Sequence, residues 1–401
     1  MAKRKASMPF WCAGNPVGDP FGVAVMDGLS SLEICDILCW AKKEKLIDFT
    51  SAHDDDLVDW NPKNPEDDLN PNSKTYKTLK ELKRKMGKVG LPMIMITCNL
   101  HTNPIFRNGG LTNPDSKIRI LAAKKVMRAL RIGNFFGAKY STYWVARDGF
   151  ESQFAVPWDR CYKYIIEGLN LATRYIHENN LSIEHGTIEN KPNEPRGEMF
   201  IPTVGHSLAM IERLEEPEFW GVNPELLQHE EMTGLSASAA AGFTASLGKL
   251  FFLHFGNQKP GQFDNDNPPL IGMDGIKETV GVFWILDQLK WNGHVEFDCH
   301  VLRTDCAPGK TNAIELRKDF IRMCVEALRM AENVADRINK DANISKMQDK
   351  MWNADPKLAG ILSEGDIEAI RKTKIDIAKV VETPIGIGRL DLAVNKKIFG
   401  K

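Results

Sequence analysis

The sequence predicts an α/β protein built around a closed (β/α)8 barrel, the TIM-barrel arrangement, followed by a helical C-terminal arm. Short apolar runs typical of buried strands alternate with longer segments of helical period, and about eight such units follow one another over roughly 330 residues. No G-x-G-x-x-G motif follows the first predicted strand, which argues against an open dinucleotide-binding sheet. The composition, 43% hydrophobic and 26% charged residues, is typical of a folded globular protein.

The predicted strands and helices alternate along most of the chain. In chain order, the predicted strands are residues 8–14, 46–52, 91–98, 139–146, 183–189, 219–225, 249–255 and 294–300. The helices predicted between and after them are residues 29–44, 75–87, 117–137, 158–178, 204–214, an alanine-rich segment, 277–289 and 320–338. The pattern therefore places one helix after each strand, as a closed barrel requires.

We expect two parts, a catalytic barrel over residues 1–340 and a helical arm over residues 341–401. From about Asp341 the chain contains only short helical segments, at residues 345–352, 356–363 and 366–381. Such segments cannot bury their apolar faces by themselves. Because the barrel already has its ring of helices, we expect the arm to contact neighbouring subunits.

The bulk composition excludes several classes of partner. Lysine plus arginine (52) nearly balance aspartate plus glutamate (53), so we expect no nucleic acid partner. No run approaches the ~20 apolar residues of a membrane span, so we expect no membrane partner. The basic N-terminal stretch lacks the apolar segment of a signal peptide. The 8 scattered cysteines lack zinc-type spacing, which predicts reduced thiols in a cytoplasmic protein.

Polar residues at the carboxyl ends of barrel strands point into the mouth where active sites form. Any one of them could be an ordinary strand-end residue facing water, but the whole set is rich in carboxylate and imidazole, which predicts metal binding. The set is Trp11, His53 with Asp54, Asp55 and Asp56, residues 97–101, Trp144, Glu189 with Lys191, Glu225, His254 and Asp298.

The stretch HFGNQKPGQFDND, residues 254–266, leaves alternatives open. His254 ends a predicted strand, and Asp264 and Asp266 form a D-x-D pair on the following loop. A D-x-D pair on a loop is by itself usually a solvated turn, and a buried histidine is often structural. The other two alternatives are a metal site and a metal site that has lost one of its usual ligands.

The segment IENKPNEPRGEMFIPTVGHSLAMIERL, residues 188–214, closely resembles the xylose isomerase signature. Further resemblances follow in the same order over essentially the whole chain: WCAG with DPFG (11–22), AHDDDL (52–57), NLHTNPIFRNGG (99–110), YWVARDG (143–149), NPE with HEEM (223–232), GKLF with FDND (248–266) and FD with RT (297–304). The chain thus resembles a divergent member of the short, actinobacterial-type group of that family. The resemblance implies a homotetramer, or at least a dimer, with arms wrapped around neighbouring subunits.

The resemblance also implies a reaction, aldose to ketose conversion by ring opening and a metal-assisted 1,2-hydride shift. His53 matches the family's ring-opening acid/base, oriented by Asp56. Lys191 would place its ammonium on the sugar's O1, and Asp266 would help to carry the proton between the two oxygens. These four residues are the implied catalytic group, with a monosaccharide as substrate.

The remaining implied site residues surround the sugar and two divalent cations. The substrate-binding group is Trp11, Phe21 (donated by a neighbouring subunit in the family), Thr97, His101 and Trp144. The implied metal ligands are Glu189, Glu225, His229, His254, Asp264, Asp266 and Asp298.

Two departures from the family pattern affect the metals. His254 stands where the family has an aspartate, and imidazole suits manganese, cobalt, iron or zinc better than magnesium. We therefore expect manganese, cobalt or iron to be favoured over magnesium, with zinc an alternative, unless His254 turns aside and leaves the site weak. Three residues instead of two separate Glu225 from His229, so either a bulge restores His229 or Gln228 takes its place. The matching residues that follow favour His229.

The sugar slot departs too, with His101 for a phenylalanine, Asn15 for a tryptophan, Val145 and Ala146 for two glycines, and His300 for a lysine. These changes leave plain xylose less well fitted. Alternatives to the isomerase are a ketose epimerase of the same superfamily, a zinc endonuclease, and a catalytically inactive sugar-binding protein. Lys191 and the D-x-D pair favour the hydride shift, and the balanced charge argues against the endonuclease.

Overall fold

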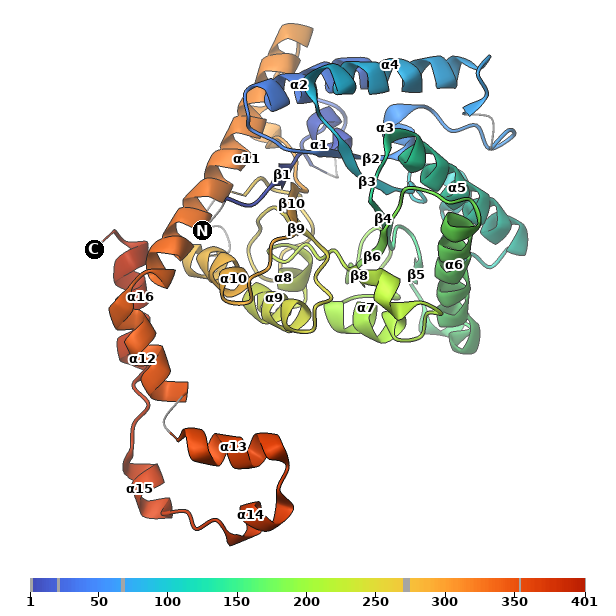
Figure 1. The fold of residues 1–401 in the computed structure, drawn as a ribbon. Helices are drawn as coiled ribbons and strands as arrows, with labels where there is room; N and C mark the ends of the chain where they lie inside the picture. Colours follow the sequence, from blue (N-terminus) through green and yellow to red (C-terminus); the bar gives the residue numbers. More distant parts are fainter. Residues whose placement is uncertain (1–2, 20–21, 66–68, 270–274, 353–354, 401) are drawn as a thin grey trace.

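The computed structural model describes residues 3–19, 22–65, 69–269, 275–352 and 355–400. Within these residues a ring of eight parallel strands forms the barrel wall (Figure 1). They are β1 (Ala6–Ser7), β2 (Thr50–His53), β3 (Met93–Thr97), β4 (Tyr140–Trp144), β6 (His185–Glu189), β8 (Trp220–Val222), β9 (Phe252–Phe255) and β10 (His294–Phe297). Pairing runs β1-β10-β9 and β2-β3-β4-β6-β8, and parallel bridges Ser7–Phe49 and Val222–Leu250 join the two groups. The predicted (β/α)8 barrel is confirmed.

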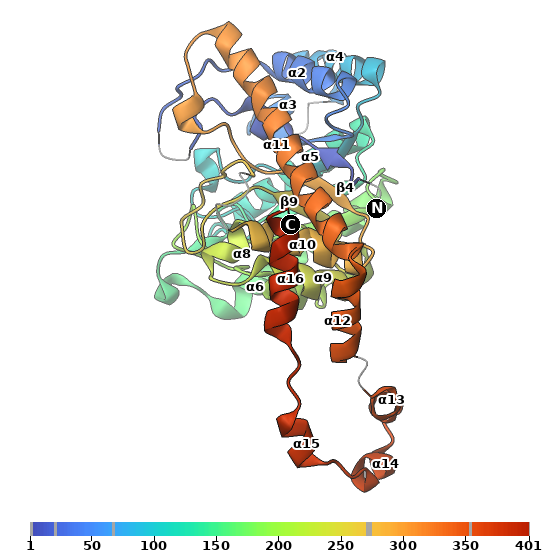
Figure 2. The ribbon, with the colours of Figure 1, turned by 90° about the vertical axis from the view of Figure 1, so that its left-hand side faces the viewer.

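Helices cover the outside of the barrel (Figures 1 and 2). The main helix after each strand is, in order, α2 (Ser31–Lys43), α4 (Lys74–Val89), α5 (Ser116–Phe136), α6 (Trp158–Glu178), α7 (Val204–Ile211), α9 (Ala237–Ser246), α10 (Ile276–Gln288) and α11 (Lys310–Asn339). Local chemistry sets their ends. Ser30 and Glu33 form a capping box at the start of α2, and Gly90 ends α4 with a left-handed φ of 64°.

Short elements lie between the strand ends and the main helices. They are the helices α1 (Phe10–Gly14), α3 (Asp54–Leu57) and α8 (His229–Met232), and an antiparallel pair formed by β5 (Gly149–Phe150) and β7 (Glu198–Met199). The strand predicted at residues 8–14 is therefore wrong. The strand β1 ends at Ser7, Pro9 is the N-cap residue of α1, and Ala13 N donates to Pro9 O. A short, wholly apolar run has no period that could distinguish the two structures.

Rings fill the amino-terminal end of the barrel. Tyr140, Phe252 and His294 are the first residues of β4, β9 and β10, and their ring centroids lie 5.3 to 5.7 Å apart. Phe49 packs against His294 with a centroid distance of 4.8 Å. This packed layer closes one end of the barrel, so the polar residues at the carboxyl ends of the strands face the end where a ligand can enter.

The last part of the chain forms the arm. It contains α12 (Ala342–Trp352), α13 (Pro356–Glu364), α14 (Ile367–Lys372), α15 (Ile377–Glu382) and α16 (Ile387–Ile398). Helices α13 to α15 project away from the barrel, and α16 returns to lie against α10, α11 and α12 (Figures 1 and 2). The single helical segment predicted at 366–381 is two helices, because Asp366 and Asp376 each cap a new one.

Two further observations bear on the composition. All eight cysteines are free thiols, and six of them are buried. Among the described residues, no helix combines the length and the apolar character that crossing a bilayer would require.

Candidate metal centre

A cavity of about 550 Å³ lies at the carboxyl end of the barrel. Most of the residues selected from the sequence line it: Trp11, His53, Thr97, His101, Trp144, Glu189, Lys191, Glu225, His229, His254, Asp264, Asp266 and Asp298. Asn15, Arg147, Glu194 and His300 line it as well. Phe21 lies outside the described residues.

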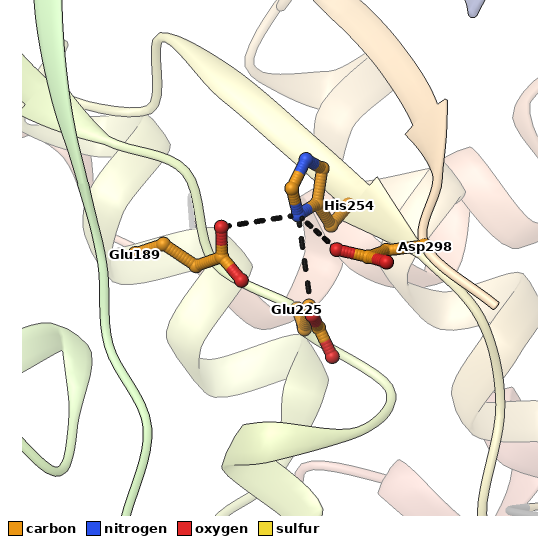
Figure 3. A group of neighbouring side chains, drawn as sticks. All are labelled: Glu189, Glu225, His254 and Asp298. Carbon is orange, nitrogen blue, oxygen red and sulfur yellow. Dashed lines mark ion pairs between the residues drawn. The ribbon is translucent and has the colours of Figure 1, made fainter. Parts of the chain in front are cut away.

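Glu189, Glu225, His254 and Asp298 form a compact group, which we call the four-residue cluster (Figure 3). They come from the ends of β6 and β9 and from the segments directly after β8 and β10. The Nδ1 atom of His254 lies 3.0 Å from Asp298 Oδ2, 3.4 Å from Glu189 Oε2 and 4.0 Å from Glu225 Oε1. Each of the four residues offers one ligand atom, and these four atoms all lie within 4.8 Å of one another. A single cation can bind ligand atoms at this spacing.

The ring of His254 faces the carboxylates and does not turn aside. Its Nδ1 atom is buried and makes no hydrogen bond, while Nε2 lies 3.3 Å from Glu296 Oε1 and 3.1 Å from Asn223 Nδ2. The side chain is 1% exposed. A buried nitrogen without a hydrogen-bond partner, surrounded by carboxylate oxygens, is the environment in which an imidazole binds a metal.

Glu225 belongs also to a second group, with His229 and Asp264. His229 Nε2 lies 3.1 Å from Glu225 Oε2 and 3.1 Å from Asp264 Oδ2, and its Nδ1 lies 2.7 Å from Asn190 O. The carbonyl of Asn190 can only accept, so Nδ1 carries a hydrogen. Burial lowers the pKa of His229, but hydrogen bonding and attraction to Asp264 outweigh it, so the net pKa lies above the usual value and Nε2 donates to that carboxylate. A cation held by Glu225 and Asp264 would take the place of this hydrogen on Nε2.

The additional residue between Glu225 and His229 is accommodated by a helical turn and not by the bulge we considered. His229 N donates to Glu225 O at 3.0 Å, an i,i+4 bond that turns both side chains to one face. Gln228 is not part of the group that His229 forms with Glu225 and Asp264, and its Nε2 atom lies 3.5 Å from Asp266 Oδ1.

Within the two groups, Lys191 and His229 compensate the charge of Asp264 and His254 compensates that of Asp298, whereas the charge of Glu225 is penalised by burial. Burial, with repulsion from Asp298, Asp264 and Glu189, raises the pKa of Glu225 well above its usual value. Burial and the neighbouring Asp264 raise the pKa of Asp266 to about 6. A bound divalent cation would compensate this charge and hold the carboxylates ionised, so the residues present fit a metal.

Lys191 and Asp266 have protein partners within the cavity. Lys191 Nζ lies 2.5 Å from Asp264 Oδ2, and its charge lies 5.5 Å from the Trp144 ring centroid. Asp266 Oδ2 lies 2.9 Å from His300 Nε2. Asp266 thus lines the cavity but stands outside both groups of candidate ligands.

His53 lines the cavity, and Asp56 contacts it from outside the set of lining residues. His53 Nδ1 lies 3.1 Å from Asp56 Oδ2, which also accepts from the His53 backbone at 2.7 Å. Burial lowers the pKa of His53, but attraction and hydrogen bonding to Asp56 outweigh it, so the net pKa lies above the usual value. The carboxylate therefore orients the imidazole and stabilises its charged form.

Aromatic rings line the space between His53 and Lys191. The ring of Trp11 lies 4.7 Å from that of His53, and its indole Nε1 donates to Asp298 Oδ1 at 2.7 Å. His101 packs edge-on to Trp144 at 4.6 Å, and burial lowers its pKa well below the usual value. The imidazole of His101 is therefore neutral and forms part of the aromatic wall of the cavity. Thr97 donates to Thr142 O at 3.0 Å.

Asp54 and Asp55, also selected at the strand ends, face away from the cavity, which corrects that expectation. Asp54 forms ion pairs with Lys125 at 2.7 Å and with Arg128, and Asp55 lies 3.0 Å from Lys125. Both cations are on α5 and are fully buried, so α3 directs these carboxylates outward, to the packing between strand and helix.

The sequence reasoning missed Glu296, which contacts His254 from inside the barrel. It lies two residues before Asp298, and side chains two apart in a strand share a face. That spacing was the available signal. Asn223, which contacts His254 from just after β8, and Arg147 and Glu194 at the cavity wall lie within the segments NPE, YWVARDG and IENKPNEPRG, and their place in these segments was the available signal.

Comparison with known proteins places this geometry in a family. The family described as "Xylose isomerase-like TIM barrel" matches residues 49–334. The chain belongs to this family. It is 27% identical over 393 residues to xylose isomerase from Thermus caldophilus, covering 97% of this chain and 96% of the relative. It is 28% identical over 341 residues to xylose isomerase from Thermus thermophilus, covering 84% and 81%.

Among solved structures, the chain is similar to D-allulose 3-epimerase from Methylomonas sp. in complex with D-allulose. The TM-score is 0.54 at 13% identity, covering 83% of this chain and 98% of that one. At this identity the likeness concerns the fold. The relatives found by sequence are xylose isomerases, and the fold that they share with a sugar epimerase does not by itself decide the reaction.

Proposed function

We propose that the protein is a metal-dependent aldose-ketose isomerase that opens the ring of a monosaccharide and shifts a hydride between C2 and C1. The observation that carries the proposal is the convergence on one cavity of two ligand groups sharing Glu225, the Lys191 ammonium and His53, which is paired with Asp56. An acid/base pair, a fixed cation and a two-cation site are the parts that such a reaction needs.

Two divalent cations per subunit are part of this proposal. The four-residue cluster would hold one, and Glu225, His229 and Asp264, with Asp266 beside them, would hold the other. Such cations polarise the two sugar oxygens and stabilise the negative charge that develops during the shift. Because His254 supplies nitrogen, we propose manganese, cobalt or iron in preference to magnesium, with zinc as an alternative.

The side chains take the following roles in the proposal. His53, oriented by Asp56, moves the proton that opens the sugar ring. Lys191 directs its ammonium at O1, and Asp266 moves the proton between O2 and O1. Trp11 and Trp144 cover the reacting carbons with apolar surface and exclude water.

We propose that the substrate is an aldose, either a pentose or a hexose, and that this sugar carries polar groups at positions where xylose has none. The neutral His101 imidazole, the Arg147 guanidinium and His300 all line the cavity. Buried hydrogen-bonding groups reject a substrate that leaves them unpaired, so the preferred sugar carries hydroxyl or similar groups to meet them.

The same site weighs against the rival functions. A ketose epimerase moves a proton at one carbon between two carboxylates on one metal, a reaction that requires neither a buried ammonium nor a second ligand group. In this cavity the buried ammonium of Lys191 is paired with Asp264, a member of the second ligand group. A binding protein without activity has no use for the His53–Asp56 pair.

The test is direct. Metal-free protein is incubated with Mg²⁺, Mn²⁺, Co²⁺, Fe²⁺ or Zn²⁺ and a panel of aldoses and ketoses, and the products are separated by chromatography. Formation of ketose from an aldose, fastest with manganese, cobalt or iron, supports the isomerase. Production of an epimeric ketose alone would establish the epimerase, and no turnover with any metal would leave the binding role.

We further propose that the protein works in the cytoplasm as a homotetramer or dimer, with the arm of residues 341–401 on a neighbouring subunit. Free cysteines suit a reducing compartment. The projecting helices expose apolar side chains, with Val381 79%, Ile367 73% and Leu362 71% exposed. Apolar residues exposed along one projecting segment are typical of a surface that another chain covers.

A further inference from the structure

Glu296 is a buried carboxylate that lies directly beneath the four-residue cluster. It pairs in register with His254 across β10 and β9, and its side chain is 0% exposed. Partners in register on parallel strands point to the same side of a sheet, so both side chains enter the barrel interior. Glu296 Oε1 lies 3.3 Å from His254 Nε2.

The other oxygen of Glu296 is bonded by two hydroxyls. Ser7 on β1 and Ser51 on β2 both donate to Glu296 Oε2. Both donors are neutral, and the ion pair that the described residues provide for Glu296 is the one with His254. The carboxylate is therefore held by strands on one side and directed at the histidine on the other.

This contact places a hydrogen on Nε2 of His254. A carboxylate only accepts, so a bond between Glu296 Oε1 and Nε2 requires the hydrogen on Nε2. The amide of Asn223 lies 3.1 Å from the same nitrogen, and its Oδ1 has no hydrogen-bond partner. Exchanging the amide oxygen and nitrogen, which geometry alone does not distinguish, gives Nε2–H a second acceptor.

With hydrogen held on Nε2, Nδ1 is the nitrogen left to give its lone pair to a cation bound among the carboxylates of the four-residue cluster. Nδ1 is the nitrogen that faces Glu189, Glu225 and Asp298. We propose that Glu296 is a positioning residue, which holds the imidazole of His254 with hydrogen on Nε2 and so directs Nδ1 at a cation in the cluster. The inference rests on the proposed function, because it requires a metal in that cluster.

The variant Glu296→Gln tests this inference with little change in volume. The amide can still bond Ser7 and Ser51, but it accepts more weakly at Nε2 and can turn its NH₂ group toward the ring. We expect the Mn²⁺ affinity of the full-length protein to fall roughly 10- to 100-fold, the range for loss of such a partner. Isothermal titration with Mn²⁺ measures the affinity, and the visible absorption of bound Co²⁺ reports whether nitrogen still ligates.

Two comparisons separate positioning from general damage. Ser51→Ala removes a donor to the same carboxylate without touching His254, and we expect it to bind Mn²⁺ within about threefold of wild type. In a His254→Ala background, adding Glu296→Gln should change the affinity little, because Glu296 acts through the ring and the two effects are not additive.

Each result has one meaning. Unchanged Mn²⁺ affinity in Glu296→Gln would overturn the inference, as would an equal loss in the wild-type and His254→Ala backgrounds, since Glu296 would then act by charge alone. A large loss in Ser51→Ala with an unchanged Co²⁺ spectrum in Glu296→Gln would make the role structural and overturn it too. Wild-type protein that binds no divalent cation would overturn the proposed function itself, a result separate from these.

Discussion

The ammonium of Lys191 lies 2.5 Å from the carboxylate of Asp264, inside the cavity and next to His229, which contacts the same carboxylate oxygen at 3.1 Å. Burial lowers the pKa of Lys191, but the attraction of Asp264 and Asp266 outweighs it, so the net pKa lies above the usual value and the ammonium stays charged. One carboxylate thus serves a fixed cation and a candidate metal ligand at once.

Lys191→Met should remove activity while preserving metal binding. The variant keeps the length of the side chain but loses the charge directed at O1, and loss of one such electrostatic contact costs about 10²- to 10³-fold in kcat. Because Asp264 is released from its ion pair, cation binding should be retained or strengthened. Steady-state kinetics on the best aldose and metal titration check both parts. An active Lys191→Met enzyme would remove Lys191 from the mechanism.

The metal preference should change when His254 is replaced together with its partner. Aspartate at 254 alone would stand beside Glu296, and two buried carboxylates repel. In the double variant His254→Asp with Glu296→Gln, that repulsion is absent and the cluster is all oxygen. We expect the ratio of Mg²⁺- to Mn²⁺-supported activity to rise at least about tenfold over wild type. The single variant His254→Asp is the control, and an unchanged ratio would argue that His254 does not set the preference.

The pH profile should report the pair formed by His53 and Asp56. Because the folded pKa of His53 is raised, the pair stabilises the fold below the free-imidazole value of about 6.5 and loses that contribution as pH rises through the folded pKa. Asp56→Asn removes the strongest attraction that opposes burial and leaves the weaker attraction of Asp54 and Asp298, so the pKa of His53 falls. The His53 limb of the kcat/KM profile should then move to lower pH. NMR titration of the His53 ring gives an independent check, and an unmoved pKa would contradict the assignment.

Stability should depend on the buried ion pairs of Asp54. Asp54→Asn leaves Lys125 and Arg128 in a fully buried place with Asp55 as the remaining acid, and breaking a buried pair costs about 3–5 kcal/mol. Urea denaturation measures the loss. Glu81→Gln, which breaks the exposed pair with Arg84, is the matched control and should leave the unfolding midpoint unchanged. Equal effects of the two variants would contradict the distinction by burial.

The projecting helices should govern assembly. Val381→Glu places a charge on α15 where the side chain is 79% exposed, so it should not disturb the subunit's own fold. If a neighbouring chain covers this residue, the charge is buried there without a partner and the oligomer should dissociate. Sedimentation analysis of wild type, Val381→Glu and the control Lys357→Glu shows whether subunit association changes. A wild-type monomer would end this proposal.

Much of the fold and of the candidate site followed from local pattern. Alternating strand and helix periods predicted the barrel, and strand-end positions selected the carboxylates and imidazoles that line the cavity. Both succeed because a parallel barrel places every strand's carboxyl end at one mouth. The pattern could not distinguish strand from helix at residues 8–14, where each position is apolar or small.

The sequence by itself determined the residue types at the mouth, the parallel barrel and the presence of an arm. Only the tertiary structure decided that a helical turn brings His229 back beside Glu225, and that α5 draws Asp54 and Asp55 away from the cavity. It alone places Glu296 behind His254. These contacts join residues from 4 to 71 positions apart. They depend on the register in which neighbouring strands pair and on the pairing of buried charges. Local periodicity carries information on neither.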